Sequence, residues 1–265
     1  MPFETINLTP IYIALGVGAL LVVLALWKKA LTIPATISAF VILVLSALFT
    51  SYTGLTVFSV SFVGIAIVGQ VKKEKRKDRE KDLYEHQGAR GLVQVLCNAM
   101  PALIYGAVYF ATGIHSFLIA SAVTVCAGVA DSAASDLGIL SDGKVISLLT
   151  FKKVERGMSG GVSLMGTISA LTTSVVVSAI VFAVGEVGIK GLWVIALMGF
   201  VGTLIDSLLG AGVQRAYRCS NCQKLTEKRL HCGAPTTLVK GLRFVDNNII
   251  NVVSLIIAGA ISLVF

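Results

Sequence analysis

Two aspartates lie inside segments that are otherwise almost wholly apolar. Asp131 belongs to "GVADSAASDLG" and Asp206 to "GTLIDSLLGAG". An ionised carboxylate in hydrocarbon costs at least about 2.5 kcal/mol and normally faces a polar cavity, a cation or a partner. Neither residue begins a helix, so we expect both to serve a functional site. Asp136, which follows Ser132 by four residues and lies closer to water, is a third candidate.

Amide side chains accompany these acids in two further segments. Gln94 and Asn98 lie four residues apart in "RGLVQVLCNAMP", and Asn247, Asn251 and Ser254 follow one stripe in "VDNNIINVVS". Spacings of three and four residues place side chains on one face of a helix. Carboxylate and amide oxygens suit Mg²⁺, which is typically held by one or two carboxylates together with substrate phosphates. The alternative is that Gln94 and Asn98 form hydrogen bonds between helices.

A glycine- and serine-rich turn, "GMSGGVSLMG" (157–166), precedes another apolar segment. Backbone N–H groups at the start of a helix, together with its dipole, favour an anion such as a polyphosphate. Ser159, Gly160, Gly161 and Ser163 are therefore candidates to bind phosphate. Such turns also serve close helix packing, which is the simpler interpretation.

Several of the other candidates have a purely local explanation. Asp246, Asn247, Ser159 and Ser163 are residue types that cap helix N-termini. Serines within helices can donate to their own backbone carbonyls, and this applies to Ser132, Ser135 and Ser207.

The composition indicates a polytopic membrane protein. Of 265 residues, 55% are hydrophobic and 14% are charged, and the mean hydropathy is +0.87, whereas about a quarter of a soluble domain is charged. We predict an all-α bundle of about eight membrane-spanning helices forming a single domain over 1–265. Apolar runs of suitable length occupy residues 11–27, 34–52, 54–70, 92–112, 115–135, 163–184, 188–212 and 248–265.

The basic residues give this bundle an orientation. With both termini outside, 21 of the 22 Lys and Arg residues fall in cytoplasmic segments and only Lys190 lies outside. This asymmetry follows the positive-inside rule. The net charge of +8 therefore reflects topology and anionic lipid, and we expect no nucleic-acid partner.

Counting along the helices places the acids at one depth. Asp206 lies 15 residues after Gly191, and Asp131 lies 16 residues after His115. At 1.5 Å per residue, both are roughly 22–24 Å from the outer surface. The amides enter from the inner side and reach the same layer. Polar residues that only join helices have no reason to share one depth, so we predict a single site at the cytoplasmic interface.

Two cytoplasmic loops have distinctive compositions. Residues 71–91 form a basic loop or surface helix, which is either a solvated charge run or a contact for a polyphosphate or lipid head group. Residues 213–247 contain Cys219, Cys222, His231 and Cys232. One interpretation is that these four residues bind a structural Zn²⁺, although an adjacent His-Cys pair is unusual for zinc. The alternative is that the cysteines remain free thiols in a reducing compartment.

Two common enzyme classes are not supported. The chain has no G-x-x-x-x-G-K-[ST] motif, which argues against a P-loop enzyme. The three histidines do not accompany a nucleophile elbow, so the sequence does not suggest a hydrolase.

The motifs "QVLCNAMPA", "AGVADSAASDLG", "GMSGGVSLMGTISAL", "GFVGTLIDSLLGAGVQ" and "FVDNNIINVVS" occur in this order. Over residues 85 to 260 the chain thereby resembles the integral membrane family that includes the phytyl-phosphate kinase of plants and cyanobacteria. The resemblance implies transfer of the γ-phosphate of CTP or UTP to an isoprenyl monophosphate, such as phytyl or geranylgeranyl phosphate. Family members often have "ADTWASELG" where this chain has "ADSAASDLG", so the loss of the aromatic residue affects the expected selectivity.

These considerations give each candidate a role. Asp131, Asp136 and Asp206 are expected to be catalytic and to bind Mg²⁺ with the phosphates. The residues expected to bind nucleotide and prenyl phosphate are Arg90, Gln94, Asn98, Ser132, Ser135, Arg156, Ser159, Gly160, Gly161, Ser163, Ser207, Gln214, Asp246, Asn247 and Asn251. The alternatives are a cytidylyltransferase that forms a CDP-lipid, and a transporter of anions or metals that performs no chemistry.

Overall fold

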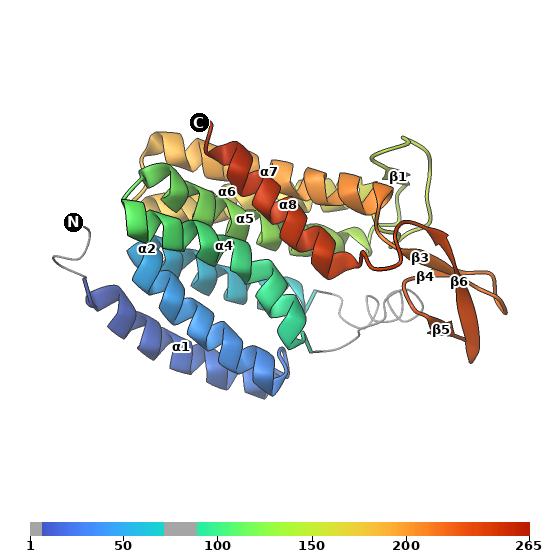
Figure 1. Cartoon of the computed structure of the whole chain (residues 1–265), viewed down its shortest axis with the longest axis horizontal. Helices are drawn as coiled ribbons and strands as arrows, with labels where there is room; N and C mark the ends of the chain where they lie inside the picture. The colour runs from blue at the N-terminus through green and yellow to red at the C-terminus, as the bar shows by residue number, and fades with distance from the viewer. Residues whose placement is uncertain (1–6, 72–88) are drawn as a thin grey trace.

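The structure is a bundle of long helices with small β-sheets at one end (Figure 1). It is a computed structural model that describes residues 7–71 and 89–265. All the described strands lie at the same end of the bundle, which we call the sheet end, and the C-terminus lies at the opposite end. Most of the basic segment predicted at 71–91 falls outside the described residues, so its structure and role stay predictions.

Seven helices are present in the described part of the chain. Six of them are long and apolar enough to cross a membrane, and α8 is a shorter apolar helix of 16 residues. A helix needs about 20 apolar residues to cross the hydrocarbon. The helices are α1 (Thr9–Lys28), α2 (Ile33–Val68), α4 (Leu92–Thr112), α5 (His115–Gly138), α6 (Leu164–Ala183), α7 (Ile189–Gly212) and α8 (Asn247–Ser262).

Helix α2 occupies both of the spans predicted at 34–52 and 54–70, and it is not straight. Thr50 and Ser51 have non-helical backbone angles, with φ +53° at Ser51. The chain turns back at this point, so that the second half returns toward the sheet end (Figure 1). Gly54 is required at this turn, because a Cβ there would overlap the Ser46 carbonyl.

A carboxylate from the loop between α6 and α7 caps the second half of α2. The backbone N–H of Tyr52 donates to Glu186 at 3.3 Å, the backbone N–H of Thr53 also donates to Glu186, and the Thr53 hydroxyl donates at 2.6 Å. The first N–H groups of a helix have no partner within the helix, and an anion there also interacts favourably with the helix dipole. Glu186 therefore stabilises the turn within α2.

Helix α5 lies at the centre of the bundle and packs against α2, α4, α6, α7 and α8. Small residues make the closest of these contacts. A Cβ on Gly202 of α7 would lie 2.6 Å from the Ala127 Cβ, and one on Gly199 would lie 2.5 Å from the Cys126 sulfur. Such residues allow two helix backbones to approach closely in a membrane. This close packing sets the separation of Asp131 on α5 from Asp206 on α7.

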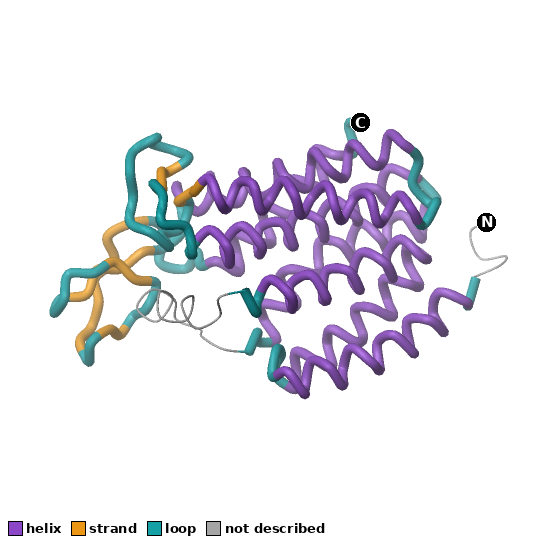
Figure 2. Tube along the Cα trace, turned by 180° about the vertical axis from the view of Figure 1, so that it is seen from behind, coloured by secondary structure: helices purple, strands orange, loops and turns teal. Residues whose placement is uncertain are grey.

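The prediction of an all-α protein is wrong at the sheet end. Strands β1 (Val145–Ser147) and β2 (Gly161–Ser163) pair antiparallel. Residues predicted as a loop at 213–247 form a four-stranded antiparallel sheet in the order β4-β3-β6-β5 (Figure 2). Its strands are β3 (Ala216–Cys219), β4 (Leu225–Thr226), β5 (Leu230–His231) and β6 (Ala234–Lys240). Five of the six described strands have only two to four residues, too few to stand out beside the hydrophobic signal of the helices.

The contact of α7 with α5 can be tested by substituting Gly202 with alanine. The added methyl group would meet Ala127 at 2.6 Å, and such overpacking costs about 1–3 kcal/mol. We expect Gly202→Ala to lower the thermal unfolding temperature of the detergent-purified protein. Gly16→Ala is the matched control, because a Cβ there meets nothing within 4 Å. Equal stability of the two variants would contradict this account of the packing.

Candidate functional site

A series of hydrogen-bonded polar side chains joins α7, α8 and α4 close to the sheet end. The Ser254 hydroxyl donates to Asp206 Oδ2 at 2.9 Å. The amide of Asn251, one turn earlier on α8, is oriented with its nitrogen 3.1 Å from the same Asp206 oxygen and its oxygen 2.9 Å from the Asn98 side-chain amide. Asn98, Asn251, Ser254 and Asp206 therefore form one connected group, as their predicted depth requires.

Asp131 of α5 completes this group, which we call the acid cluster: Asp131, Asp206, Asn98, Asn251 and Ser254. The Asp131 carboxylate lies within electrostatic range of Asp206, Asp136 and the Arg90 guanidinium. Asp131 and Asp206 are partly enclosed rather than exposed. Two carboxylates held near each other repel unless a proton or a cation lies between them. The arrangement therefore suits a divalent cation with oxygen ligands.

An apolar layer closes the bundle on the other side of the acid cluster. Val123, Cys126, Ile195 and Met198 belong to one buried group that spans α5 and α7 and extends into α2, α4, α6 and α8. All four side chains are less than 5% exposed. The acid cluster thus has a hydrophobic floor on the side away from the sheet end.

Two of the candidate residues cap helices that begin at this end. The Ser163 hydroxyl accepts the backbone N–H of Gly166 at 3.1 Å and caps α6. The Asp246 carboxylate accepts the N–H of Ile249 at 3.1 Å and caps α8. Asp246 also lies 3.7 Å from the Arg215 guanidinium. Capping, the simpler interpretation of both residues, is confirmed.

A second polar group connects the glycine-rich turn to the four-stranded sheet. The Glu227 carboxylate accepts the Ser159 hydroxyl at 2.9 Å and the Gln214 side-chain amide at 2.8 Å. The Lys240 ammonium donates to the carbonyl of Gly210 at 3.1 Å and to that of Ser159 at 3.4 Å. We call Ser159, Gln214, Glu227 and Lys240 the turn network.

The glycines of this turn have structural roles. Gly160 has φ +77°, and a Cβ there would overlap the backbone of Ala211 at the end of α7. The Gly161 N–H donates to the Met158 carbonyl at 2.9 Å. The Ser159 hydroxyl and the Gly161 N–H therefore have internal partners in this structure, and binding of phosphate by this turn stays a prediction.

Burial shifts the pKa of two members of the turn network toward the neutral form. Desolvation raises the pKa of Glu227, although the hydrogen bond from Ser159 and the charge of Arg215 oppose this effect. Desolvation also lowers the pKa of Lys240. Both shifts disfavour charge, as expected for groups packed between a helix end and a sheet.

The remaining candidates lie in several places. Arg90 forms backbone hydrogen bonds with Ala30 and Thr32. The guanidinium of Arg156 lies 3.6 Å from Asp142, and both line an open hollow of about 600 Å³ in the β1–β2 connection. Ser132 and Asp136 line a cavity between α2, α5 and α6. Ser135 and Asn247 are exposed, whereas Gln94 and Ser207 are partly buried on α4 and α7.

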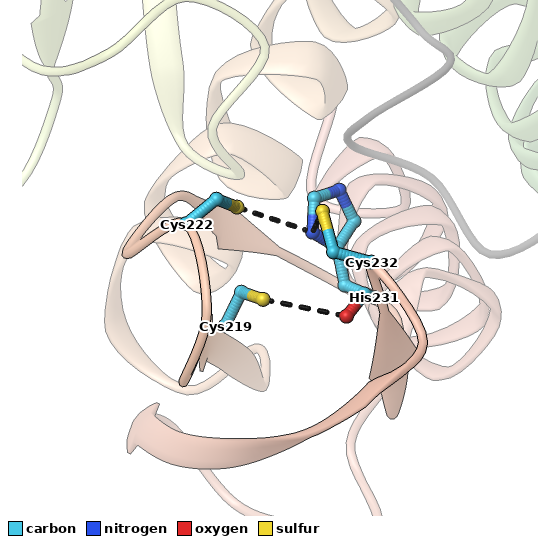
Figure 3. A group of neighbouring side chains, drawn as sticks. All are labelled: Cys219, Cys222, His231 and Cys232. Atoms are coloured by element: carbon cyan, nitrogen blue, oxygen red, sulfur yellow. Dashed lines mark hydrogen bonds between the residues drawn. The ribbon is translucent and has the colours of Figure 1, made fainter.

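The cysteine and histidine candidates converge on one point in the four-stranded sheet (Figure 3). Ligand atoms of Cys219, Cys222, His231 and Cys232 all lie within 4.8 Å of one another. The backbone N–H of Cys222 is the main cause that lowers the pKa of the Cys219 thiol to about 6. The geometry therefore favours metal binding over four unrelated thiol and imidazole groups.

Two members of the turn network, Glu227 and Lys240, were not predicted from the sequence. Each is one charged residue among many in a polar segment, and no spacing rule distinguishes it. Their role depends on the β3–β6 pairing, which brings Lys240 beside Ala216. Glu227 and Lys240 could therefore have been identified only by predicting that sheet.

Comparisons with known proteins agree on a membrane family. Residues 16–259 match the family described as "Integral membrane protein DUF92". The chain is 32% identical to "Protein PGR" of Arabidopsis thaliana over 87% of each protein. An uncharacterised membrane protein of Methanocaldococcus jannaschii is 29% identical over 58% of this chain and 62% of its own. One from Synechocystis is 27% identical over 62% and 64%. No solved structure gives a significant match.

The raised pKa of Glu227 predicts a pH dependence of stability. The contribution of its buried neutral form is fully present below the ordinary carboxyl pKa and is lost as pH rises through the raised value. Glu227→Gln keeps an oxygen for Ser159 and Gln214 and stays neutral. We therefore expect the variant to gain thermal stability relative to wild type as pH rises from about 4 to about 7.

Thermal unfolding of the detergent-purified proteins across this pH range measures the effect. Glu155→Gln is the control, because Glu155 is exposed and its variant is expected to follow the wild-type curve. A constant difference between Glu227→Gln and wild type at every pH would contradict the proposed protonation.

Proposed function

The chain belongs to the DUF92 family of integral membrane proteins, and we propose that it is a membrane-embedded kinase for isoprenyl monophosphates. It would transfer the γ-phosphoryl group of a nucleoside triphosphate, with CTP or UTP as the donors that the family resemblance suggests. The observation that supports this proposal most directly is the pairing of Asp131 with Asp206 beside Asn98, Asn251 and Ser254.

The reaction needs positioning and charge neutralisation more than covalent catalysis. An oxygen of the prenyl monophosphate forms a bond to the γ-phosphorus, and the bond from that phosphorus to the β,γ-bridging oxygen breaks. The products are the prenyl diphosphate and the nucleoside diphosphate. Phosphoryl transfer of this kind needs no covalent enzyme intermediate.

The side chains of the acid cluster fit Mg²⁺. Carboxylates and amide oxygens are ligands that this ion prefers, and it retains waters and phosphate oxygens as further ligands. When bound, Mg²⁺ would neutralise the phosphate charge that develops during transfer. Asp131 and Asp206 would hold it, Ser254 and Asn251 would orient Asp206, and Arg90 would supply positive charge nearby.

The cavity between α2, α5 and α6 suits the isoprenyl chain. It has a volume of about 180 Å³ and is lined mainly by apolar residues such as Val60, Ile65 and Val176, with Asp136 and Ser132 among the few polar ones. A prenyl chain would enter this cavity from lipid tails of similar polarity, so van der Waals packing against the cavity walls rather than removal from water would favour binding. The isoprene units nearest the phosphate would lie there, with the phosphate directed toward Asp136 and the acid cluster.

The topology proposed with this function has eight crossings. The turn at Thr50 and Ser51 divides α2 into two halves that run in opposite directions, and α8 supplies the last crossing. The sheet end would face the cytoplasm, where nucleotides are available, with both termini outside. Lys28 is the last residue of α1, Lys144 directly precedes β1, and Arg215 follows α7, all at this end, as the positive-inside rule requires.

The apolar floor favours an enzyme over a transporter. A substrate path would need polar groups or a cavity leading from the acid cluster to the far end. Val123, Ile195 and Met198 fill this region of α5 and α7, and each is less than 5% exposed.

The proposal predicts a labelled lipid product. Purified protein in lipid nanodiscs, supplied with Mg²⁺, phytyl or geranylgeranyl phosphate and γ-³²P-labelled CTP, is expected to yield labelled prenyl diphosphate. Thin-layer chromatography separates this product from the nucleotide. With α-³²P-labelled CTP, the lipid is expected to stay unlabelled.

Label from α-³²P-CTP in the lipid, with release of pyrophosphate, would replace the kinase proposal with a cytidylyltransferase. Absence of transfer from CTP, UTP and ATP to any of several prenyl phosphates would reject both activities.

The acid cluster predicts which substitutions slow phosphoryl transfer. Asp131→Asn and Asp206→Asn keep the shape of the side chain but remove a charge, and loss of one such group costs about 10²–10³-fold in rate.

Ser254→Ala removes the hydrogen bond that orients Asp206, so we expect about 10–100-fold weaker use of Mg²⁺. Initial rates measured against Mg²⁺ concentration test both effects. Glu155→Gln, an exposed acid outside the cluster, is expected to keep full activity. Wild-type rates in Asp206→Asn would refute the assignment.

A further inference from the structure

The four-stranded sheet contains a candidate metal site that the proposed phosphoryl transfer does not use. Cys219 ends β3, Cys222 follows in the β3–β4 turn, and His231 and Cys232 lie at the end of β5. Their side chains point toward one centre in Figure 3, and the ligand atoms lie within 4.8 Å of one another. Ligands of a tetrahedral zinc ion are about 3.6–3.8 Å apart, given bonds of about 2.3 Å to sulfur and 2.0–2.1 Å to nitrogen. The described geometry needs only small adjustments to reach these values.

The position of the His231 imidazole supports a metal at this centre. Its Nδ1 atom lies 3.4 Å from the Cys222 sulfur and 3.3 Å from the Cys232 sulfur. One ring nitrogen can share a single proton, so it cannot hydrogen-bond two thiols equally. Two sulfurs and a nitrogen around a common metal satisfy all three atoms.

The adjacency of His231 and Cys232 is explained by the backbone. Neighbouring side chains on a strand normally point to opposite faces. Cys232 has φ +53°, and Gly233 has φ +72°, so the chain leaves the strand direction directly after His231. This turn brings the Cys232 sulfur to the same side as the imidazole. The unusual sequence spacing is therefore compatible with one site.

The surroundings of Cys219 also fit a metal-bound thiolate. Cys219 is fully buried, and His231 is 8% exposed. The backbone N–H of Asn221 donates to the Cys219 sulfur at 3.4 Å. Hydrogen bonds of this kind stabilise negative charge on a metal ligand and hold it in orientation. Three cysteines and one histidine select zinc among the common cellular metals, and four protein ligands leave no open position for catalysis.

The sheet needs a support of this kind. Strands β4 and β5 contain two residues each, and so small a unit has little apolar area to stabilise it. The segment between Cys222 and His231 nevertheless places Glu227 against Ser159 at 2.9 Å and Gln214 at 2.8 Å. Ligands on both sides of Glu227 would fix the ends of this segment.

We propose that Cys219, Cys222, His231 and Cys232 bind one structural Zn²⁺, which holds the four-stranded sheet together and keeps Glu227 in contact with Ser159 and Gln214. The site is independent of the proposed kinase activity, because its evidence is the ligand geometry alone. Zinc binding and phosphoryl transfer can therefore succeed or fail separately.

Metal content is the direct test. Mass spectrometry of the detergent-purified full chain is expected to find about one zinc ion per protein, as four protein ligands imply. Cys222→Ser and Cys232→Ser are expected to lose most of it. Cys97→Ala is the matched control, since Cys97 lies on α4 outside the sheet, and it should retain the metal.

Two results would overturn the proposal: wild-type protein without zinc after growth and purification with zinc present, or equal zinc in Cys222→Ser, Cys232→Ser and wild type. A variant that fails to fold does not prevent the test, because wild-type protein reconstituted with Co²⁺ reports the site by itself. Visible bands of tetrahedral cobalt with thiolate ligands are expected, and an octahedral spectrum would contradict the assignment.

Proteolysis tests separately whether the zinc ion holds the segment around Glu227 in place. Removal of zinc by a chelator is expected to speed trypsin cleavage after Lys228 and Arg229 about tenfold, because proteolysis follows local opening, and added zinc should reverse the effect. Glu227→Ala is expected to keep the metal while increasing the same cleavage. Unchanged cleavage after metal loss would show that zinc does not hold this segment. Mass spectrometry of the fragments separates these sites from other cleavage sites.

Discussion

The burial of two carboxylates among apolar helices is the constraint on which the sheet end of this protein depends. A charge taken out of water must find a partner or a cation, or it destabilises the fold. Asp206 has Ser254 and the Asn251 amide as hydrogen-bond donors, and Asp131 lies opposite on α5. Both depend on the close approach of α7 and α5, which Gly199 and Gly202 permit. The close packing of the α5 and α7 backbones therefore also sets how near the two carboxylates lie to each other.

The backbone N–H groups at helix starts find different kinds of partner at the two ends of the bundle. At the far end, Glu186 satisfies backbone N–H groups of Tyr52 and Thr53, so its charge is used to cap the second half of α2. At the sheet end, Ser163 and Asp246 cap the N-termini of α6 and α8. Asp131 and Asp206 lie within helices and cap neither of them. The distinction between capping acids and acids within helices therefore separates structural from candidate functional residues.

Sequence patterns predicted the helices and the convergence of the acids well, because both follow from helix geometry and hydrophobic length. The shared depth of Asp131 and Asp206 and the stripe of Asn251 and Ser254 need only a rise of 1.5 Å per residue. The strands, Glu227 and Lys240 were missed for a physical reason: their positions depend on pairing between distant short segments, such as Ala216 with Lys240. The break predicted between the spans 34–52 and 54–70 is confirmed, because the backbone is non-helical at Thr50 and Ser51. Periodicity could not show that Glu186, far along the chain, stabilises this turn.

The charges around Asp131 also determine what kind of ligand the site can accept. Among the groups that act on it electrostatically, Asp136 and Asp206 are acidic and Arg90 is basic, so fully ionised side chains would give the site a net negative charge. A free anion such as a nucleotide would be repelled by such a site, whereas a nucleotide that carries Mg²⁺ presents positive charge to the carboxylates. Positive side chains lie further toward the sheet end, with Lys240 on Gly210 and Arg215 beside Asp246. This order, with acids beneath and bases above, is compatible with the proposed metal–polyphosphate complex, which would enter from the sheet end with its cation toward the bundle.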